Sequence, residues 1–501
     1  MTKILHTIII NLNLIILILL LNSNICYSEF IKTIGENGII EYPIGIFQME
    51  DNLILSATAA TNYSTVNEIL FQKLDTLGNI ISTNKLRMFS NFYLSGMDIL
   101  KDSSGFILSG NYETNLLGKA IQTGFILKLD KDGNKLWMQD FLLNIGKTLF
   151  YKTNELEDGS IVVAGGIINS DKNNLFDYLI IKTNSFGELL WHKSYGTYGN
   201  EVAKRAVQTK DGDFILSGDS NGSLENESYS SNTNVYVMGL DSAGEFKWHY
   251  FIGNGNLPFG CQEHILTKDD NVVICGEGTV DKNGTFDFLL VRVDKDGKIL
   301  NQKTIGSPEF SEAAFSICEY KNGNFGFVGY ENSTTAGFIQ RFIYYLIDSE
   351  FNVILKHAFT QSGRGQGNYI GLGMNESVLM AGIIQNDDIF DDGLICYLNP
   401  NNKLITSINN TNQTEQKNNL EVNLFPNPSY DFININSNLS FDLISVYNSL
   451  GECKENIFTE ENNGYKKEYN LNTTKYSAGL YYLKLSKNNK YVGSQTFIKS
   501  N

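Results

Sequence analysis

Residues that commonly carry enzymatic chemistry are sparse in this chain of 501 residues. Only five residues are histidine, and four of them follow residue 28: His192, His249, His264 and His357. The sequence contains no H-E-x-x-H metalloprotease motif and no phosphate-binding glycine loop. A pair of catalytic carboxylates from distant segments stays open, because such a pair leaves no local motif. We therefore assign no catalytic residue from the sequence.

Metal and cofactor sites are also weakly indicated. Asp130-Lys-Asp132 and Asp294-Lys-Asp296 resemble the start of a calcium-binding loop, but the further oxygen ligands and the distal Glu are missing. The acidic loop Asp387–Asp392 is a better cation candidate, although such loops are most often only solvated. We expect no metal ion, cofactor or disulfide framework. The cysteines after residue 28 are odd in number and lack C-x-x-C spacing: Cys261, Cys275, Cys318, Cys396 and Cys453.

Four residues form the one specific binding hypothesis. Lys152, Arg205 and Glu263 are spaced by 53 and 58 residues, and Tyr369 follows 106 residues later, which is twice 53. This regular spacing places them at equivalent points of repeated units, where they would form a polar patch for an anionic or sugar ligand. The alternative is that Arg205 and Glu263 pair with each other and only neutralise charge.

The unit that positions these residues is a repeat in the middle of the chain. Its signature is a short apolar strand that ends in a small residue and Gly. We attribute the small residues to crowding of neighbouring units near a common axis. Successive copies are spaced by 53, 55, 53, 58, 53 and 53 residues, and their last residues are Ala57, Gly110, Gly165, Gly218, Gly276, Gly329 and Gly382.

A second landmark is a D-x-x-G turn between two further strands of the repeat. This pattern predicts a type I turn that is closed by a left-handed glycine. The three tryptophans each follow the first turn residue by seven positions, so we expect them to pack in the core or between repeats. The turns are Asp75–Gly78, Asp130–Gly133, the variant Asn184–Gly187, Asp241–Gly244 and Asp294–Gly297, and the tryptophans are Trp137, Trp191 and Trp248.

Each repeat therefore holds about four strands, which is the size of one β-propeller blade. Seven copies predict an all-β fold with a seven-bladed β-propeller over residues 29–408, whose closure removes exposed sheet edges. An open-ended solenoid is the alternative architecture. Either Glu29–Gly35, which resembles a fourth strand, or Lys403–Ile408 could complete the last blade.

The innermost strands are expected to line a channel, and the loop Ser220–Asn234 is a possible contact at its rim. Counting nine residues back from the start of each apolar segment predicts one level of this channel. That level contains Ile44, Met97, Lys152, Arg205, Glu263, Ser316 and Tyr369.

Charge and the first residues indicate the compartment. The 39 basic and 55 acidic side chains give a formal charge of −16, which argues against binding nucleic acid or anionic membrane. Lys3 precedes the apolar run Ile8–Leu21, so residues 1–28 are expected to be a secretory signal cleaved after Ser28. A membrane anchor, which would need about 20 apolar residues, and lipidation at Cys26 are the alternatives. We expect no transmembrane segment in the mature chain.

The remainder of the chain carries a different set of motifs. Residues 409–419 lack apolar periodicity and are expected to be a linker. About seven short strands within residues 420–501 predict a small immunoglobulin-like β-sandwich. Its motifs are Leu424-Phe-Pro-Asn-Pro428, Val446-Tyr-Asn-Ser-Leu-Gly-Glu452, Ser477-Ala-Gly-Leu-Tyr-Tyr-Leu-Lys-Leu485 and Phe497-Ile-Lys499.

These motifs resemble the C-terminal sorting domain (type A) of proteins exported by the type IX secretion system of the Bacteroidetes. The resemblance covers about residues 422–501. It implies that this domain engages the secretion machinery, and that the protein is secreted or attached to the outer cell surface after passing through the periplasm. An ordinary immunoglobulin-like accessory domain is the alternative.

The expected function follows from both parts. The repeats loosely resemble those of secreted Bacteroidetes proteins with D-x-x-G…W units, which indicates a fold and no activity. We expect a binding or adhesion module for polysaccharide or protein, more readily than an enzyme. The alternative is a secreted polysaccharide hydrolase or lyase with its site in the propeller channel.

Overall fold

In the computed structural model, the described part of the protein is all-β. No helix among the described residues is long and apolar enough to cross a membrane. The expected signal, the linker, Lys403–Ile408 and most of the acidic loop lie outside the described residues. The structure describes residues 30–34, 40–398 and 422–499, apart from 50–51, 61–65, 76–77, 89–91, 117–118, 144–146, 170–174, 223–228, 254–256, 280–284, 334–338, 360–363, 374–375, 386–390, 426–428, 449–452, 459–465 and 488–489.

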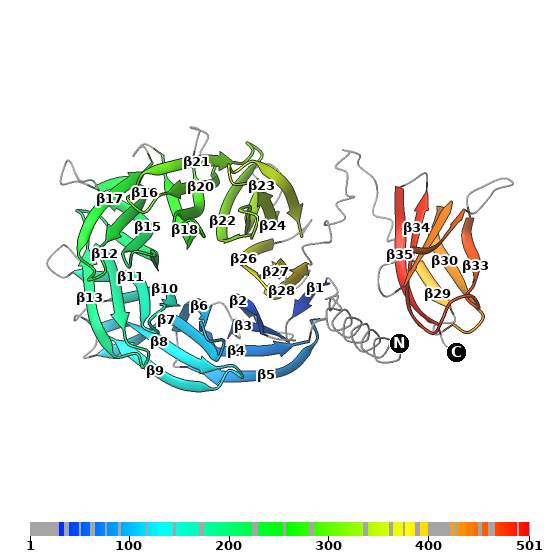
Figure 1. Ribbon diagram of the computed structural model, residues 1–501, viewed down its shortest axis with the longest axis horizontal. Helices are drawn as coiled ribbons and strands as arrows, with labels where there is room; N and C mark the ends of the chain where they lie inside the picture. Colours follow the sequence, from blue (N-terminus) through cyan, green and yellow to red (C-terminus); the bar gives the residue numbers. More distant parts are fainter. Residues whose placement is uncertain are drawn as a thin grey trace, which may run out of the picture. The chain divides into compact units, whose positions relative to one another are not determined.

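Two compact units divide the chain, and strands β1 to β28 belong to the first. This unit is built from antiparallel meanders, in which each strand pairs with the next one along the chain. Figure 1 shows the meanders one after another around a common centre, with their first strands, such as β6, β10 and β18, innermost. This is the arrangement of a β-propeller.

Five meanders form separate four-stranded sheets in the described part of the first unit. In order, these are β2 (Ile40–Met49), β3 (Asn52–Ala60), β4 (Val66–Leu74), β5 (Ile80–Arg87); β6 (Phe92–Ile99), β7 (Gly105–Leu116), β8 (Lys119–Asp130), β9 (Lys135–Phe141); β10 (Thr148–Glu155), β11 (Ile161–Asn169), β12 (Leu175–Thr183), β13 (Leu189–Tyr195); β14 (Glu201–Gln208), β15 (Phe214–Gly222), β16 (Tyr229–Leu240), β17 (Phe246–Ile252); and β18 (Phe259–Leu266), β19 (Val272–Gly278), β20 (Asp287–Val293), β21 (Ile299–Ile305).

The remaining strands described for the first unit form one eight-stranded sheet. It consists of two four-strand runs, which a single parallel pair between Gln340 and Arg364 connects. The first run contains β22 (Phe310–Glu319), β23 (Phe325–Ser333), β24 (Gln340–Ile347) and β25 (Val353–Ala358), and the second contains β26 (Arg364–Leu372), β27 (Val378–Gln385), β28 (Asp391–Leu398) and β1 (Phe30–Ile34).

The first and last meanders close the ring in two ways. Strand β1 pairs antiparallel with β28, from Phe30 opposite Tyr397 to Ile34 opposite Gly393. Side chains of the first meander also share a hydrophobic core with β27 and β28. An open-ended solenoid is therefore wrong for this unit. The shared core contains Ile46, Leu74, Leu379, Ala381, Ile395 and Tyr397.

Most of the core lies between neighbouring meanders. Val162 and Ile180 of one sheet pack with Phe214 and Met238 of the next in a single buried cluster. The middle strands are therefore covered on both faces, which explains why β11 is a nearly continuous apolar run. The fourth strand, such as β13, alternates between exposed and partly buried residues because its meander ends there.

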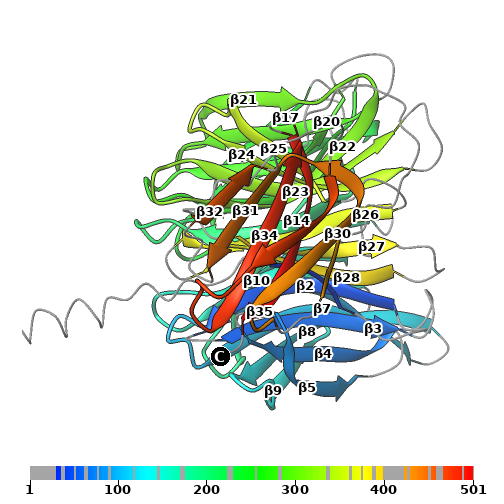
Figure 2. The ribbon, with the colours of Figure 1, turned by 90° about the vertical axis from the view of Figure 1, so that its right-hand side faces the viewer.

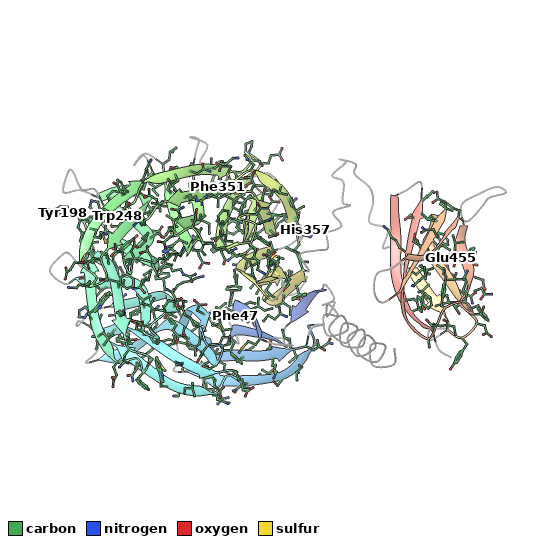
Figure 3. All side chains as sticks on the ribbon, viewed as in Figure 1. Phe47, Tyr198, Trp248, Phe351, His357 and Glu455 are labelled. Carbon is green, nitrogen blue, oxygen red and sulfur yellow. The ribbon has the colours of Figure 1, made fainter. Side chains whose placement is uncertain are left out.

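The D-x-x-G turns and the tryptophans contact each other between neighbouring meanders. The turn glycines Gly187, Gly244 and Gly297 have φ values of 82°, 82° and 88°, as the turn pattern predicts. A Cβ at each of them would strike a tryptophan of the preceding meander, Trp137, Trp191 or Trp248 respectively. The tryptophans therefore pack between repeats, as their shared position predicts. Figure 3 shows Trp248 toward the outside and Phe47 nearer the centre.

The meander of β22–β25 departs from the turn pattern. Its turn begins at Asp348, and Phe351 takes the place of the left-handed glycine with a φ of 63°. Phe351 is fully buried and packs against Phe325 with ring centroids 6.0 Å apart. Burial of this ring offsets the strain of a positive φ at a residue with a side chain. The D-x-x-G pattern did not predict this turn, because the pattern requires a glycine at the position that Phe351 occupies.

The repeated glycine lies within the second strand of the meander, and its tightest contact differs from the predicted crowding between neighbouring units. The inner strand of each meander contains a β-bulge opposite this position, for example between Ala203 and Arg205 opposite Gly218 and Ser217. A Cβ at Gly218 would overlap the carbonyl oxygen of Val202, in its own sheet. The close approach is therefore within the sheet, and the same holds at Gly110, Gly165, Gly276, Gly329 and Gly382.

The predicted rim loop Ser220–Asn234 is partly strand. Strand β15 continues to Gly222, β16 begins at Tyr229, and these two residues pair across the hairpin. The described residues of this insertion therefore lengthen the β15–β16 hairpin. Residues 223–228 lie outside the described part of the chain.

Seven strands in two sheets make up the described part of the second unit. Its buried cluster includes Ile433 and Leu471 from one sheet and Val446 and Leu483 from the other, so the sheets share one core. Figure 2 shows β31, β32 and β34 side by side. The sheets are β29 (Val422–Phe425), β30 (Phe432–Phe441), β33 (Lys466–Asn472), and β32 (Cys453–Phe458), β31 (Leu443–Asn448), β34 (Gly479–Lys487), β35 (Lys490–Lys499).

Adjacent glycines of β11 provide a matched test of the bulge. Gly165→Ala would force a Cβ into the carbonyl oxygen of Leu149, whereas Gly166→Ala would place it 3.2 Å from the Phe176 ring, which can shift. We expect Gly165→Ala to lower the free energy of unfolding by about 2–3 kcal/mol in denaturant titration, and Gly166→Ala to cost distinctly less. Equal losses for the two variants would show that the bulge sets no limit at this position.

Candidate functional site

A β-bulge at one level of every inner strand creates the site. A bulge inserts one extra residue and lets two consecutive side chains face the same side. At one of these bulges, the consecutive residues Lys204 and Arg205 both reach the centre, where Arg205 lines one cavity and Lys204 lines another. The bulges fall between Pro43 and Gly45, Leu94 and Gly96, Phe150 and Thr153, Ala203 and Arg205, Cys261 and Glu263, Ala314 and Ser316, and Gly367 and Tyr369.

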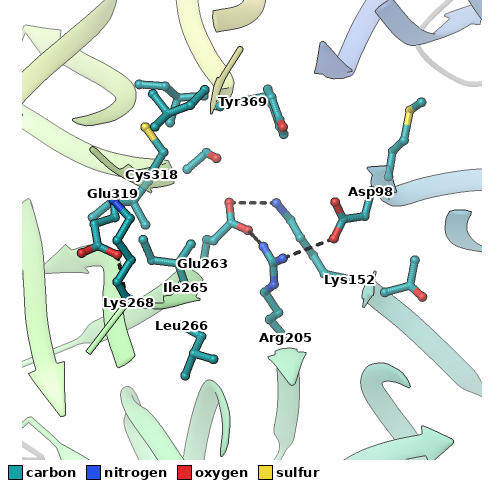
Figure 4. Close-up of a pocket in the computed structure, with 17 residues that line it drawn as sticks. Asp98, Lys152, Arg205, Glu263, Ile265, Leu266, Lys268, Cys318, Glu319 and Tyr369 are labelled. Atoms are coloured by element: carbon teal, nitrogen blue, oxygen red, sulfur yellow. Dashed lines mark hydrogen bonds and ion pairs between the residues drawn. The ribbon is translucent and has the colours of Figure 1, made fainter. Parts of the chain in front are cut away.

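The structure brings together all four residues of the binding hypothesis. Lys152, Arg205, Glu263 and Tyr369 line one cavity of about 390 Å³, which we call the charged cavity. Figure 4 shows these side chains converging from different strands. Ser316 and Asp98 line the same cavity, the latter having been missed by sequence reasoning.

The predicted channel level fails in the first two meanders. Gly45 and Gly96 pair with Ser56 and Ser109, in the way that Arg205 pairs with Ser217. The equivalent residues are therefore these glycines, and Ile44 and Met97 are each displaced by one position. The cause is the length of the first hairpin in each meander. In the reference meander, three residues separate Thr209 from Asp213. Only two residues connect β2 to β3, and four residues separate Leu100 from Gly105. Met97 still lines the charged cavity, and Ile44 lines the second one.

Four charged side chains form a connected network across the charged cavity. The carboxylate of Glu263 lies 2.9 Å from Lys152 Nζ and 2.5 Å from an Arg205 guanidinium nitrogen. Arg205 also approaches Asp98, with 3.6 Å between nitrogen and oxygen. Two of these pairs join strands that are not neighbours in the ring, β10 to β18 and β6 to β14. The network therefore spans the centre and carries no net formal charge.

Burial decides how the two carboxyl groups differ. Only 3% of the Glu263 side chain is exposed. Burial alone would raise the pKa of Glu263, but Lys152 and Arg205 outweigh it and hold the pKa below its usual value. Burial also raises the pKa of Asp98, and there Arg205 only partly compensates. The network thus holds one firmly ionised carboxylate and one that protonates more easily.

Tyr369 contributes an aromatic surface to the charged cavity. Its ring packs against Phe47 of the first meander, with centroids 5.2 Å apart. Burial raises the pKa of Tyr369 well above its usual value, so the phenol stays protonated. Tyr369 therefore offers a ring and a neutral hydroxyl to the site and no basic group.

A buried serine–histidine contact lies close to the cavity but is not accessible. Ser217 Oγ hydrogen-bonds to His264 Nδ1 and lies 3.2 Å from Cys261 Sγ. All three residues are fully buried, and burial lowers the pKa of His264 to about 3. The imidazole is therefore neutral, and no substrate can reach the serine. This cluster is part of the core and not a nucleophilic site.

Metal binding gains no support in the part of the chain that the structure covers. No group of three or more His, Cys, Asp or Glu side chains there could hold a metal ion. The predicted turn at Asp130 uses its carboxylate internally, accepting hydrogen bonds from the backbone of Asp132 and Asn134 at 2.9 and 2.8 Å. These bonds support the turn interpretation of the D-x-D-G segments.

A family comparison bears on the second unit. Residues 423–500 match the family model described as a secretion system C-terminal sorting domain. The match supports the sorting domain of the type IX secretion system that the motifs indicated, and it implies secretion or a cell-surface location. No curated protein matches the chain.

Solved structures similar to this chain include a lyase, the β-propeller domain of a protease and a hydrolase. A PL25 ulvan lyase, described as a polysaccharide lyase, has a TM-score of 0.47 and 11% identity, with 73% of this chain and 96% of that chain covered. The β-propeller domain of the trilobed protease from Pyrococcus furiosus has a TM-score of 0.40 and 10% identity, covering 72% and 93%. A puromycin hydrolase has a TM-score of 0.42 and 10% identity, with 68% of this chain and 50% of that chain covered.

The buried network predicts a specific stability effect. Arg205→Met removes a partner from both Glu263 and Asp98, and should lower the free energy of unfolding by about 3–5 kcal/mol in denaturant titration. The control is Lys295→Met, which removes an exposed partner of Asp211 and should change stability little. If both variants were equally stable, the network would contribute nothing to the fold.

Proposed function

We propose that this protein is an exported seven-bladed β-propeller that acts as a binding or adhesion module for polysaccharide or protein. Residues 1–28 would be removed as a signal peptide, residues 29–408 would form the propeller, and 409–419 would be the linker. Residues 420–501, an immunoglobulin-like sandwich, would direct passage through the periplasm and type IX machinery. The observation that carries the proposal is the sorting-domain match at residues 423–500.

The count of seven blades rests on the connectivity of the first unit. Five separate four-stranded meanders and the two runs of the eight-stranded sheet would each be one blade. The last blade would take three strands from residues 364–398 and its outer strand from β1. Such sharing of one blade between both ends of a chain fastens a ring shut, because the ends cannot separate without breaking a sheet.

Binding fits the charged cavity better than catalysis does. Lys152, Arg205 and Glu263 are already paired with one another, so they form a fixed polar surface and not a set of free reactive groups. We propose that a ligand entering this cavity rests on that surface and on the ring of Tyr369. Paired charges with partly exposed edges can still donate and accept hydrogen bonds with little reorganisation.

One observation favours the second candidate, a polysaccharide hydrolase or lyase. Asp98 and Glu263 both contact Arg205, and their environments move their pKa values in opposite directions. Two carboxyl groups whose pKa values are pushed apart commonly act as the general acid and the general base of one active site. In this candidate, Asp98 would supply the proton and Glu263 would stay ionised.

Removal of the second unit tests the export proposal. A chain that lacks residues 420–501, expressed in a host with a type IX secretion system, should accumulate in the periplasm and be absent from the surface and medium. A reporter placed between residues 1–28 and 409–501 should be exported in the same host. Normal surface or medium levels of the truncated chain would overturn the sorting role.

A combined retention and product assay separates binding from catalysis. The purified mature protein should be retained on some immobilised polysaccharides or surface proteins without releasing new reducing ends or unsaturated sugars. Asp98→Asn should leave this retention intact. Product formation by the wild type that Asp98→Asn abolishes would instead establish the enzyme.

A further inference from the structure

A second cavity lies at the centre of the first unit, on the other side of the bulges. Its volume is about 470 Å³, and we call it the aromatic cavity. Residues at the bulges or just before them in the chain line the aromatic cavity. Residues at the bulges or after them line the charged cavity. Lys152 lines both cavities, so its ion pair with Glu263 lies at their boundary. The aromatic cavity is lined by Tyr42, Pro43, Ile44, Phe92, Tyr93, Leu94, Ser95, Tyr151, Lys152, Lys204, Gln262, Phe315 and Asn368.

Aromatic rings make up much of this lining. Tyr93 is the most accessible of them, with 61% of the residue exposed. Tyr42, Tyr151 and Phe315 are partly exposed and come from three other inner strands. Phe315 is held against Tyr330 with ring centroids 5.7 Å apart. The cavity therefore presents flat apolar surfaces from several sides.

Two primary amides in the cavity are fixed in orientation. Asn368 Nδ2 donates to the carbonyl of Pro43 at 3.2 Å, and its Oδ1 accepts from Gln366 at 2.9 Å. Gln262 Nε2 donates to both carboxylate oxygens of Glu277, at 3.2 and 3.1 Å. Side chains held by their own partners offer their remaining hydrogen-bonding capacity without a further ordering cost.

The charges around this cavity are compensated. Lys204 Nζ lies 3.4 Å from Asp219 and 4.4 Å from the centre of the Tyr151 ring. Lys152 is paired with Glu263. Burial raises the pKa of Glu277, and its hydrogen bonds from Gln262 only partly oppose this. Both cations among the described residues that line the cavity are therefore compensated and do not favour an acidic ligand.

We propose that the aromatic cavity binds a neutral oligosaccharide. A sugar ring has an apolar face of C–H groups that packs on an aromatic ring and an edge of hydroxyls that exchange hydrogen bonds with amides and carboxylates. A pocket with aromatic walls and a few fixed polar groups meets both needs, and its volume lies in the range of ligand sites, about 300–1,000 Å³. The inference rests on the proposed binding function, and it adds the ligand class and the cavity.

Titration calorimetry on the mature protein tests this inference. The probes are cello-, xylo- and manno-oligosaccharides, with an oligogalacturonate as the acidic comparison. At least one neutral probe should bind more tightly than the oligogalacturonate. Tyr93→Ala and Gln262→Ala should each weaken that binding by about tenfold or more, equivalent to about 1.4 kcal/mol. Phe186→Ala, which removes another exposed aromatic ring from a turn between two outer strands, is the matched control and should bind as the wild type does.

The outcomes distinguish this inference from the broader proposal. Binding that survives Tyr93→Ala and Gln262→Ala but is lost in a folded Arg205→Lys variant would place the ligand in the charged cavity. That result, tighter binding of the oligogalacturonate, or no binding of any neutral probe would each overturn the inference. The binding function itself would fall only if the retention assay on immobilised polysaccharides and surface proteins were also empty.

Discussion

The β-bulge at one level of each inner strand is the constraint on which the rest of the first unit depends. The bulge brings a backbone carbonyl of the inner strand so close to the second strand that a Cβ does not fit there, as at Gly165 and Gly218. It also turns two consecutive side chains toward the centre, such as Lys204 and Arg205. One backbone feature therefore accounts for both the repeated glycine and the presence of two cavities.

The buried charges at the centre are stabilised by a connected network of ion pairs and not by isolated pairs. Glu263 is almost fully buried, which by itself disfavours its ionised form, and two cations from different strands compensate for that cost. Because Lys152 and Asp98 reach across to strands that are not their neighbours, the network also links the far parts of the ring. All four residues of the network line the charged cavity, and Lys152 also lines the aromatic cavity.

The outer part of the ring makes this centre rigid. Each tryptophan packs on the turn glycine of the next meander, and buried clusters join one sheet to the next around the ring. Strand β1 completes the last run of strands, so no meander of the described part is left unpaired. A rigid frame keeps the cavity walls in place, which lowers the ordering cost of binding a ligand there. The sorting domain has a core of its own, separate from these cavities.

The sequence by itself determined the repeat, its strands and turns, and the sorting domain, because these depend on local patterns of apolar residues, glycine and short motifs. It also placed Lys152, Arg205, Glu263 and Tyr369 at equivalent points, since those meanders share hairpins of the same length. Only the tertiary structure decided that Asp98 joins the network and that a second cavity forms. It also decided that Ile44 and Met97 lie one residue away from the positions equivalent to Arg205. These facts depend on hairpin lengths and bulges that shift single residues, and on which strands face each other across the centre.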